Sequence, residues 1–287
     1  MPGQAGPVEA VTITLVSIVL GALTGLVLAL TGAGGTIIAV PLLIFGLHFT
    51  VAQAAPVALL AVSLSAGIGA LIAHRQRLVR YRAAGFIAVT GIITAPLGIW
   101  GAQHLPNTPL TMLFAAVLFF VAIRMLLRGE APNQPPHTSA EQPCESVSVP
   151  CRLEYDQGRL VWNWPCARIL ALFGATTGFL SGLLGVGGGF VVVPALRKAT
   201  NLPMQSILAT SLAVIALVSA MGVITASSLG GMNWPVALPF AAGALGGMLT
   251  GRLFARRLEG PRLQQGFAVI AILVALGMAG KAILSLI

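Results

Sequence analysis

Residues 32–36 read GAGGT and residues 185–189 read GVGGG, and each of these glycine motifs interrupts a strongly apolar stretch of the chain. A proline follows each motif five residues after its last member. The two copies align without a gap from residue 21 to 41 and from 174 to 194. Internal repetition indicates two copies of one structural unit. The sequence therefore predicts a fold in two halves, each organised around one glycine motif.

The composition predicts a membrane protein. Of 287 residues, 57% are hydrophobic and only 8% are charged, and the mean hydropathy is +0.94. Soluble domains contain about 25% charged residues, so a soluble globule of this composition is not expected. The formal net charge is +9, but the arginines cluster in short loops between apolar runs, as they do when charge sets membrane orientation. Nucleic acid is therefore not an expected partner, whereas the lipid bilayer is.

Ten apolar segments follow one another along the chain. Most of them reach the ~17–25 residues that a membrane-spanning helix needs, but the second segment of each half is shorter. We interpret this pattern as a helix, a glycine break and a short returning helix, followed by three spanning helices. The first ten residues contain no Lys or Arg, so we expect the first segment to stay in the bilayer uncleaved. The segments are approximately 11–30, 36–47, 51–73, 83–101, 109–127, 167–184, 190–196, 204–226, 235–251 and 263–286.

A polar, proline-rich stretch divides the chain. It begins GEAPNQPPHTS at residue 129 and shows no apolar period, so we expect a flexible tether, with partner binding as the alternative. The predicted units are residues 1–128, a linker 129–165, and residues 166–287. Cys144, Cys151 and Cys166 lie in or beside the linker without a CxxC pair, and we expect free thiols.

The arginines predict opposite orientations for the two halves. In the first half they lie between the third and fourth segments, whereas in the second half they lie one loop later. Because basic loops remain in the cytoplasm, both termini are expected outside and the linker inside a cell (inner) membrane. The two clusters are Arg75, Arg77, Arg80 and Arg82, and Arg252, Arg256, Arg257 and Arg262. The predicted fold is an all-α polytopic membrane protein with two inverted-topology repeats, an arrangement typical of secondary transporters with mid-membrane sites.

The glycine motifs predict an anion site. Irregular backbone at membrane depth is tolerated where it is buried in protein or lines a cavity, and a helix that restarts there presents unpaired N–H groups. Two such helix N-termini facing each other favour an anion without a buried Lys or Arg. Tight helix packing is the alternative, and we expect it for Gly21, Gly25, Gly174 and Gly178. The predicted site consists of Gly32, Gly34, Gly35, Thr36, Gly185, Gly187, Gly188 and Gly189, with hydroxyls from Thr31 and Ser181 and further donors at Thr24 and Thr177.

The predicted spans contain no acidic residue, and their cores contain no histidine. A carboxylate proton relay or cation site is therefore not expected, nor is a cofactor or a bound metal. An intramembrane hydrolase would use Ser63 or Ser211 as a nucleophile, but neither has an obvious base, so we do not expect an enzyme.

The second motif and the apolar run that follows it, GVGGGFVVVP at residues 185–194, resemble the TauE/SafE sulfite exporter family of anion permeases. The resemblance continues at residues 209–212, ATSL, and more weakly through the first half. It implies a permease for sulfite, sulfoacetate or a related sulfur-containing anion, generally exported. The first half has Thr36 opposite Gly189 and lacks the hydroxyls of Thr210 and Ser211. We therefore expect an asymmetric site to which Thr210 and Ser211 contribute, with hydrogen bonding inside their own helix as the alternative.

The predicted function is export of a small sulfur-containing anion through a mid-membrane site. The alternatives are a transporter of another small solute, anion or metal ion, and a membrane assembly factor that transports nothing. A metal substrate would need His, Cys, Met or carboxylate ligands in the core, which has few of them. An assembly factor has no need of backbone exposed at mid-depth, so the paired glycine motifs count against it. A homodimer is the assembly left open.

Overall fold

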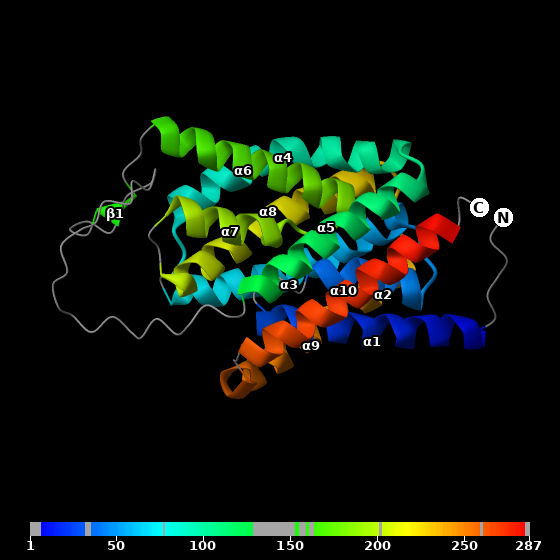
Figure 1. The fold of residues 1–287 in the computed structure, drawn as a ribbon. Helices are drawn as coiled ribbons and strands as arrows, with labels where there is room; N and C mark the ends of the chain where they lie inside the picture. Colours follow the sequence, from blue (N-terminus) through cyan, green and yellow to red (C-terminus); the bar gives the residue numbers. More distant parts are fainter. Residues whose placement is uncertain are drawn as a thin grey trace.

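The computed structural model describes residues 7–31, 36–76, 78–128, 153–154, 159–160, 164–200, 203–258 and 261–284. Ten helices and one short strand pair run through these residues (Figure 1). The helices of the first half are α1 Pro7–Thr31, α2 Thr36–Gly46, α3 Val51–Arg75, α4 Tyr81–His104 and α5 Asn107–Arg128. Those of the second half are α6 Trp164–Leu184, α7 Gly189–Ala199, α8 Met204–Ser228, α9 Trp234–Leu258 and α10 Pro261–Leu284.

The strand pair lies within the predicted linker. β1 Leu153–Glu154 pairs antiparallel with β2 Arg159–Leu160, and Leu153 is opposite Leu160. The proline-rich stretch that begins at residue 129 lies outside the described residues.

The helix pattern confirms a polytopic membrane protein whose candidate spans are all helices. Among the described residues, seven helices are long and apolar enough to cross a bilayer. Helices α3 and α8 have 25 residues each, about 38 Å at 1.5 Å per residue, whereas α2 and α7 have only 11 residues each. The two short helices begin at the ends of the two glycine motifs, as predicted, at Thr36 and at Gly189.

Helices α3 and α8 form the centre of the bundle. The Ser63 hydroxyl donates to the Ala216 carbonyl over 3.2 Å, and these residues are the midpoints of the two helices. A β-carbon built at Gly69 would lie 3.2 Å from Leu212 Cδ1, and one at Gly222 would lie 2.8 Å from Leu59 Cδ1. Later residues of α3 thus meet earlier residues of α8, so the two central helices run antiparallel.

Two closely packed helix pairs flank this centre, α1 with α9 and α4 with α6. A β-carbon at Gly21 would overlap the Phe240 carbonyl oxygen, and one at Gly178 would overlap the Gly91 carbonyl oxygen. Only glycine allows backbones to approach this closely, as in small-xxx-small packing of membrane helices. The packing role predicted for the glycines of residues 21–25 and 174–178 is confirmed.

The helix pairings keep the same pattern when the halves are exchanged. Exchanging each helix with its counterpart converts the α1–α9 pair into the α6–α4 pair and the α4–α8 pair into the α9–α3 pair. The α3–α8 and α5–α10 pairs convert into themselves. The contacts therefore have approximate twofold symmetry.

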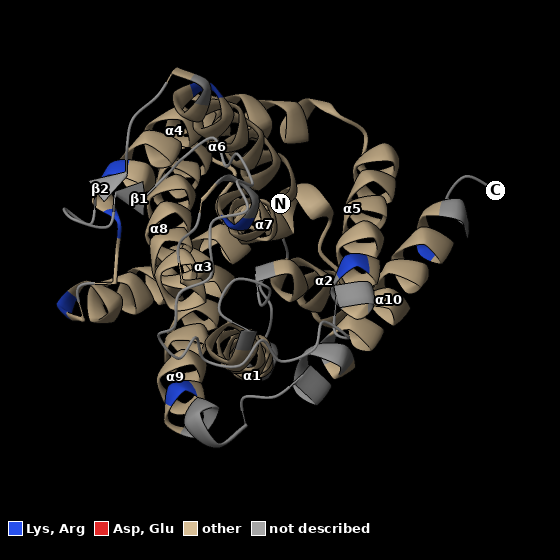
Figure 2. Ribbon diagram, turned by 60° about the vertical axis from the view of Figure 1, so that its left-hand side comes forward, with Lys and Arg blue, Asp and Glu red and all other residues tan. Residues whose placement is uncertain are grey.

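Basic residues gather at one end of the bundle. Arg75 ends α3, Arg82 lies in the first turn of α4, and Arg197 lies in the last turn of α7. Figure 2 turns the end that carries β1 and β2 toward the viewer and shows Lys and Arg at helix termini there. The beginning of α1 and the end of α10 lie at the opposite end (Figure 1).

Cys166 is disulfide-bonded, so the prediction of a free thiol is wrong for this residue. It is buried in the first turn of α6. The absence of a CxxC pair excluded only a local bridge, whereas a disulfide joins residues brought together by the fold. Cys144 and Cys151 lie outside the described residues.

Candidate functional site

The second glycine motif forms a sharp break between α6 and α7. Gly185, Gly187 and Gly188 have φ angles of 72°, 68° and 72°, in the left-handed region that residues with a side chain rarely adopt. The Gly185 N–H still donates to the Ser181 carbonyl over 2.9 Å, so the last turn of α6 closes before the chain reverses. This backbone conformation explains why the motif consists of glycine.

The break lies between the midpoints of the central helices. A β-carbon at Gly187 would lie 2.8 Å from Val62 Cγ1 and 3.2 Å from Ile215 Cγ2, and these side chains belong to the middle turns of α3 and α8. All five residues of the motif are buried. Irregular backbone is therefore enclosed by protein halfway along the spanning helices, the arrangement in which a bilayer tolerates it.

The first turn of α7 leaves two donors free. Gly188 precedes the helix in a left-handed conformation and provides no side-chain cap. Its carbonyl accepts from Val191 and Val192, but among the described residues the N–H groups of Gly189 and Phe190 have no backbone partner. Unpaired N–H groups carry the partial positive charge of the helix N-terminus, and this charge favours an anion.

Three buried hydroxyls lie on the two helices that pack against the same break. Thr177 and Ser181 lie one turn apart on α6, and Ser219 lies on α8 with its oxygen 3.2 Å from the position of a Gly187 β-carbon. Each side chain is at most 1% exposed, and none of the three hydroxyls has a hydrogen-bond partner. An unsatisfied buried hydroxyl costs about 1–3 kcal/mol. Sequence reasoning missed Ser219, whose only local signal is a serine in the middle of an apolar helix.

Thr210 and Ser211 use their hydroxyls within α8. The Thr210 hydroxyl donates to the Ser206 carbonyl over 2.6 Å and accepts from the Arg80 N–H over 3.2 Å. The Ser211 hydroxyl donates to the Leu208 carbonyl over 2.9 Å. The structure thus shows the intrahelical bonding that the sequence left as an alternative. A ligand contact by these two residues stays a prediction, and it requires each hydroxyl to give up its carbonyl.

The first glycine motif lies outside the described residues. Helix α1 ends at Thr31 and α2 begins at Thr36, so Gly32, Gly34 and Gly35 fall in the gap between them, and the side chains of both threonines are also outside the description. Thr24 lies in α1 before the motif, and its hydroxyl donates to the Leu20 carbonyl over 2.9 Å. That the two motifs face each other stays a prediction.

Arg252 differs from the loop residue that the sequence predicted. Helix α9 continues to Leu258, so Arg252 lies inside a candidate span and its guanidinium is partly buried. Its Nη1 is buried without a hydrogen-bond partner. The preceding residue, Gly251, packs against Leu26 and Ala29 of α1.

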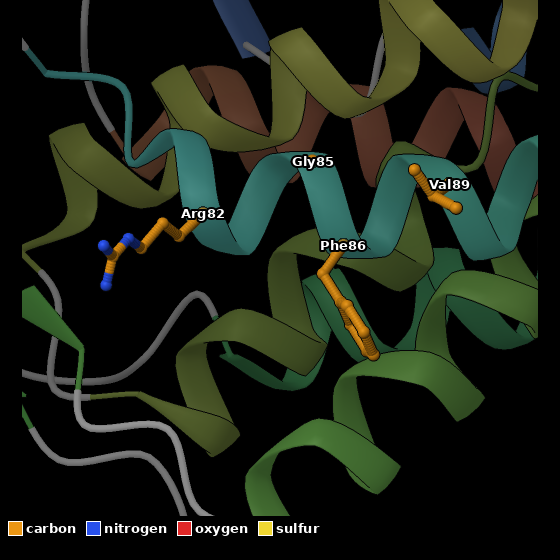
Figure 3. A pocket seen from close by; sticks show the side chains of 4 residues that line it. All are labelled: Arg82, Gly85, Phe86 and Val89. Atoms are coloured by element: carbon orange, nitrogen blue, oxygen red, sulfur yellow. The ribbon is translucent and has the colours of Figure 1, made fainter.

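A separate surface pocket of about 420 Å³ lies along the first turns of α4 (Figure 3). Arg82, Gly85, Phe86 and Val89 line it. None of these residues belongs to the glycine break. Among the described residues, no group of three His, Cys, Asp or Glu side chains is placed to hold a metal ion.

Comparison with known proteins agrees with the fold. The chain is 30% identical over 285 residues to a "Probable membrane transporter protein" of Xylella fastidiosa (strain Temecula1), covering 95% of this chain and 97% of that protein. It is 24% identical over 269 residues to the "Probable membrane transporter protein YunE" of Bacillus subtilis (strain 168), covering 91% and 95% of the two chains. No solved structure matches significantly.

The sequence profile of the family named "Sulfite exporter TauE/SafE" matches residues 17–278, which include both glycine motifs, residues 17–31 of α1 and the whole of α2, α6 and α7. The match covers far more than half of the chain, and the transporter relatives cover nearly all of it. This protein is therefore a membrane transporter that belongs to the sulfite exporter TauE/SafE family.

Proposed function

We propose that this transporter is a permease that exports a small sulfur-containing anion, such as sulfite, sulfoacetate or a related organosulfonate. The observation that carries the proposal is the buried break at residues 185–189, which lies at the midpoints of α3 and α8 and leaves the N–H groups of Gly189 and Phe190 unpaired. Donors without acceptors at mid-depth favour an anionic substrate, because an anion supplies the missing acceptors. The membership in a sulfite exporter family supports a sulfur oxyanion in particular.

The proposed architecture is a pair of inverted repeats, residues 1–128 and 166–287. The antiparallel course of α3 and α8 and the exchange symmetry of the helix pairings support this proposal. An inverted repeat places the site at the interface of its two halves, and alternating access then follows from rocking one half against the other. The first glycine motif, residues 32–36, is proposed to supply the opposing helix N-terminus.

The proposed orientation places the basic end of the bundle in the cytoplasm and both chain termini outside, in a cell membrane. The basic residues at the ends of α3, α5 and α7 and at the beginnings of α4 and α6 support it. The disulfide of Cys166 points the other way, because disulfides are rare in the cytosol. The arginine bias outweighs this single bond, because it extends over the ends of five helices.

The membrane potential is the proposed driving force. A potential of 100 mV, negative inside, is worth about 2.3 kcal/mol per elementary charge, roughly a fortyfold concentration ratio for a monovalent anion and twice the energy for a dianion. Outward movement of an anion thus needs no coupled ion. All seven acidic residues lie outside the candidate spans, which fits a mechanism without a proton-carrying carboxylate.

The test is a flux assay on purified protein in liposomes loaded with sulfite. An imposed potential, negative on the loaded side, should accelerate sulfite release in protein-containing vesicles and leave protein-free vesicles unchanged. Release of sulfoacetate and of a short alkylsulfonate is assayed in parallel. Release of potassium ions is measured as the control for cation transport. Release of potassium without any sulfur anion, or indifference to every sulfur anion tried, would contradict the proposal.

A further inference from the structure

Three hydroxyl groups on the helices around the second glycine motif are buried without using their protons. Thr177, Ser181 and Ser219 are fully or almost fully buried, and none of their hydroxyls has a hydrogen-bond partner. Most other buried hydroxyls among the described residues donate to a carbonyl, as Thr210 does to Ser206. Buried polar groups are normally paired, so three unpaired groups at one place need an explanation.

Two of the three side chains reach the backbone of the break, and the third lies one helical turn away on α6. The Ser219 oxygen approaches Gly187 from α8, at 3.2 Å from the place of a β-carbon. The Thr177 side chain covers Gly188, where a β-carbon would overlap the threonine methyl group. Ser181 follows Thr177 by one helical turn and therefore lies on the same face of α6. The free N–H groups of Gly189 and Phe190 begin at the same break.

The first half has no unpaired hydroxyl at the three positions that align with these residues. In the gapless repeat alignment, Thr24 corresponds to Thr177, and its hydroxyl is bonded to the Leu20 carbonyl. Leu28 stands at the position of Ser181. Ala66 stands at the position of Ser219 when α3 and α8 are aligned on their midpoints. Ser65 of α3 is also buried without a hydrogen-bond partner, but it aligns with Val218, so the set of three donors belongs to the second half.

We propose that Thr177, Ser181 and Ser219 form one asymmetric anion subsite, in which their three O–H groups donate to the oxygens of the transported anion. This inference rests on the proposed function and specifies the residues that would recognise the substrate. The matching ligand is a small oxyanion with at least three acceptor oxygens, because each of the three hydroxyls has a proton to donate. Sulfite and the sulfonate head group meet this description. One such subsite in each chain implies one anion bound per chain.

The experiment removes each hydroxyl by the substitution that changes the shape of the side chain least. Thr177→Val, Ser181→Ala and Ser219→Ala are each assayed for sulfite flux and for the thermal unfolding midpoint without ligand. A hydroxyl that donates to the substrate gives a KM about tenfold higher when it is lost. Because the same hydroxyl is unsatisfied in the empty protein, its removal leaves the midpoint unchanged or raises it by about 2–4 °C. Weaker transport together with equal or higher stability is the expected result.

Two control variants calibrate this result. Thr111→Val removes a buried hydroxyl of α5 that already donates to the Asn107 carbonyl over 2.7 Å, and it should leave KM unchanged. Thr94→Val removes a hydroxyl that donates from α4 to the Ala175 carbonyl of α6 over 2.9 Å, and it should lower the midpoint and leave the KM of the folded protein unchanged.

The outcomes separate this inference from the proposed function. If the wild-type protein transports sulfite and all three variants keep its KM, the subsite is wrong and the permease stands. Lower midpoints with unchanged KM would assign the hydroxyls to a structural role, such as holding buried water, and would also overturn the subsite. If sulfite raises the unfolding midpoint of the wild type but not of Ser219→Ala, and no flux is seen, the subsite stands and the transport proposal fails.

Discussion

At the scale of single residues, the glycine break combines two demands that no other amino acid meets together. Gly187 needs a left-handed φ, and it also leaves no room for a side chain between Val62 and Ile215. Gly230 has nearly the same φ, 71°, but a β-carbon there would meet nothing within 4 Å. Substitutions at Gly187 and Gly230 therefore separate two effects. Both strain the backbone, but only a side chain at residue 187 also fills the candidate site.

We expect Gly187→Ala to abolish most of the transport and Gly230→Ala to leave it intact. Both variants carry about 1–2 kcal/mol of left-handed backbone strain. Only the β-carbon at residue 187 displaces the side chains of the central helices and enters the space beside Ser219. The measurement is flux per folded protein in liposomes, with the unfolding midpoint recorded for each variant. Equal flux from the two variants would show that the break is merely a turn.

Gly187→Leu extends this series to a larger side chain. It should remove transport completely while the protein is still inserted and expressed, because the spanning segments keep their hydropathy. Membrane fractionation and flux measured on the same preparation check this expectation. Retained flux at wild-type rate would exclude residue 187 from the permeation path.

At the scale of helices, two glycine-rich interfaces hold the central pair in place. Gly25 of α1 lies so close to α9 that a β-carbon would overlap the Ala244 carbonyl oxygen and lie 2.8 Å from the Met248 nitrogen. These backbone atoms belong to a helix and cannot turn aside as a flexible side chain does. The close approach therefore depends on glycine at this position.

Gly25→Leu should separate α1 from α9 and lower the free energy of unfolding by at least about 1–3 kcal/mol, the usual cost of overpacking. The matched control is Gly246→Ala on α9, where a β-carbon would meet nothing within 4 Å and alanine is the better helix former by about 1 kcal/mol. Thermal unfolding of both purified variants checks the prediction. A midpoint for Gly25→Leu at or above that of the control would contradict it.

At the scale of the whole molecule, the directions of the helices determine which basic helix ends lie on the same side of the membrane. The Arg80 N–H donates to the Thr210 hydroxyl, so the beginning of α4 meets the beginning of α8. Helix α9 runs in the same direction as α1, since Gly21 lies beside Phe240 and Gly25 beside Ala244 and Met248. The arrangement brings the Arg80 region and the end of α9 to one side of the bundle.

We therefore expect single cysteines introduced near Arg80 and near Arg257 to react from the same side of the membrane, the cytoplasmic side. The measurement uses a membrane-impermeant thiol reagent on intact cells and on inverted vesicles, in a background from which the three native cysteines have been removed. Labelling of both positions only from outside would show that the Cys166 disulfide, and not the arginines, reports the orientation. Labelling from opposite sides would rule out the inverted repeat.

The sequence determined the helical membrane fold, the short helices after the glycine motifs and the packing glycines. These features depend on local properties, namely the hydropathy of a segment and the backbone freedom of glycine, and they are visible in residues 21–41 and 174–194. The sequence also lists every hydroxyl near the site, but it does not show which of them lack a hydrogen-bond partner.

Only the tertiary structure distinguished Ser219 from Ser211. Both serines are buried on α8, yet Ser211 donates to the Leu208 carbonyl, whereas Ser219 lies beside Gly187 without a partner. Likewise, the extent of α9 decided that Arg252 is inside a helix, and the fold decided that Cys166 is bonded. Whether a polar group is satisfied depends on neighbours that are distant in the chain, and a pattern within one segment does not contain that information.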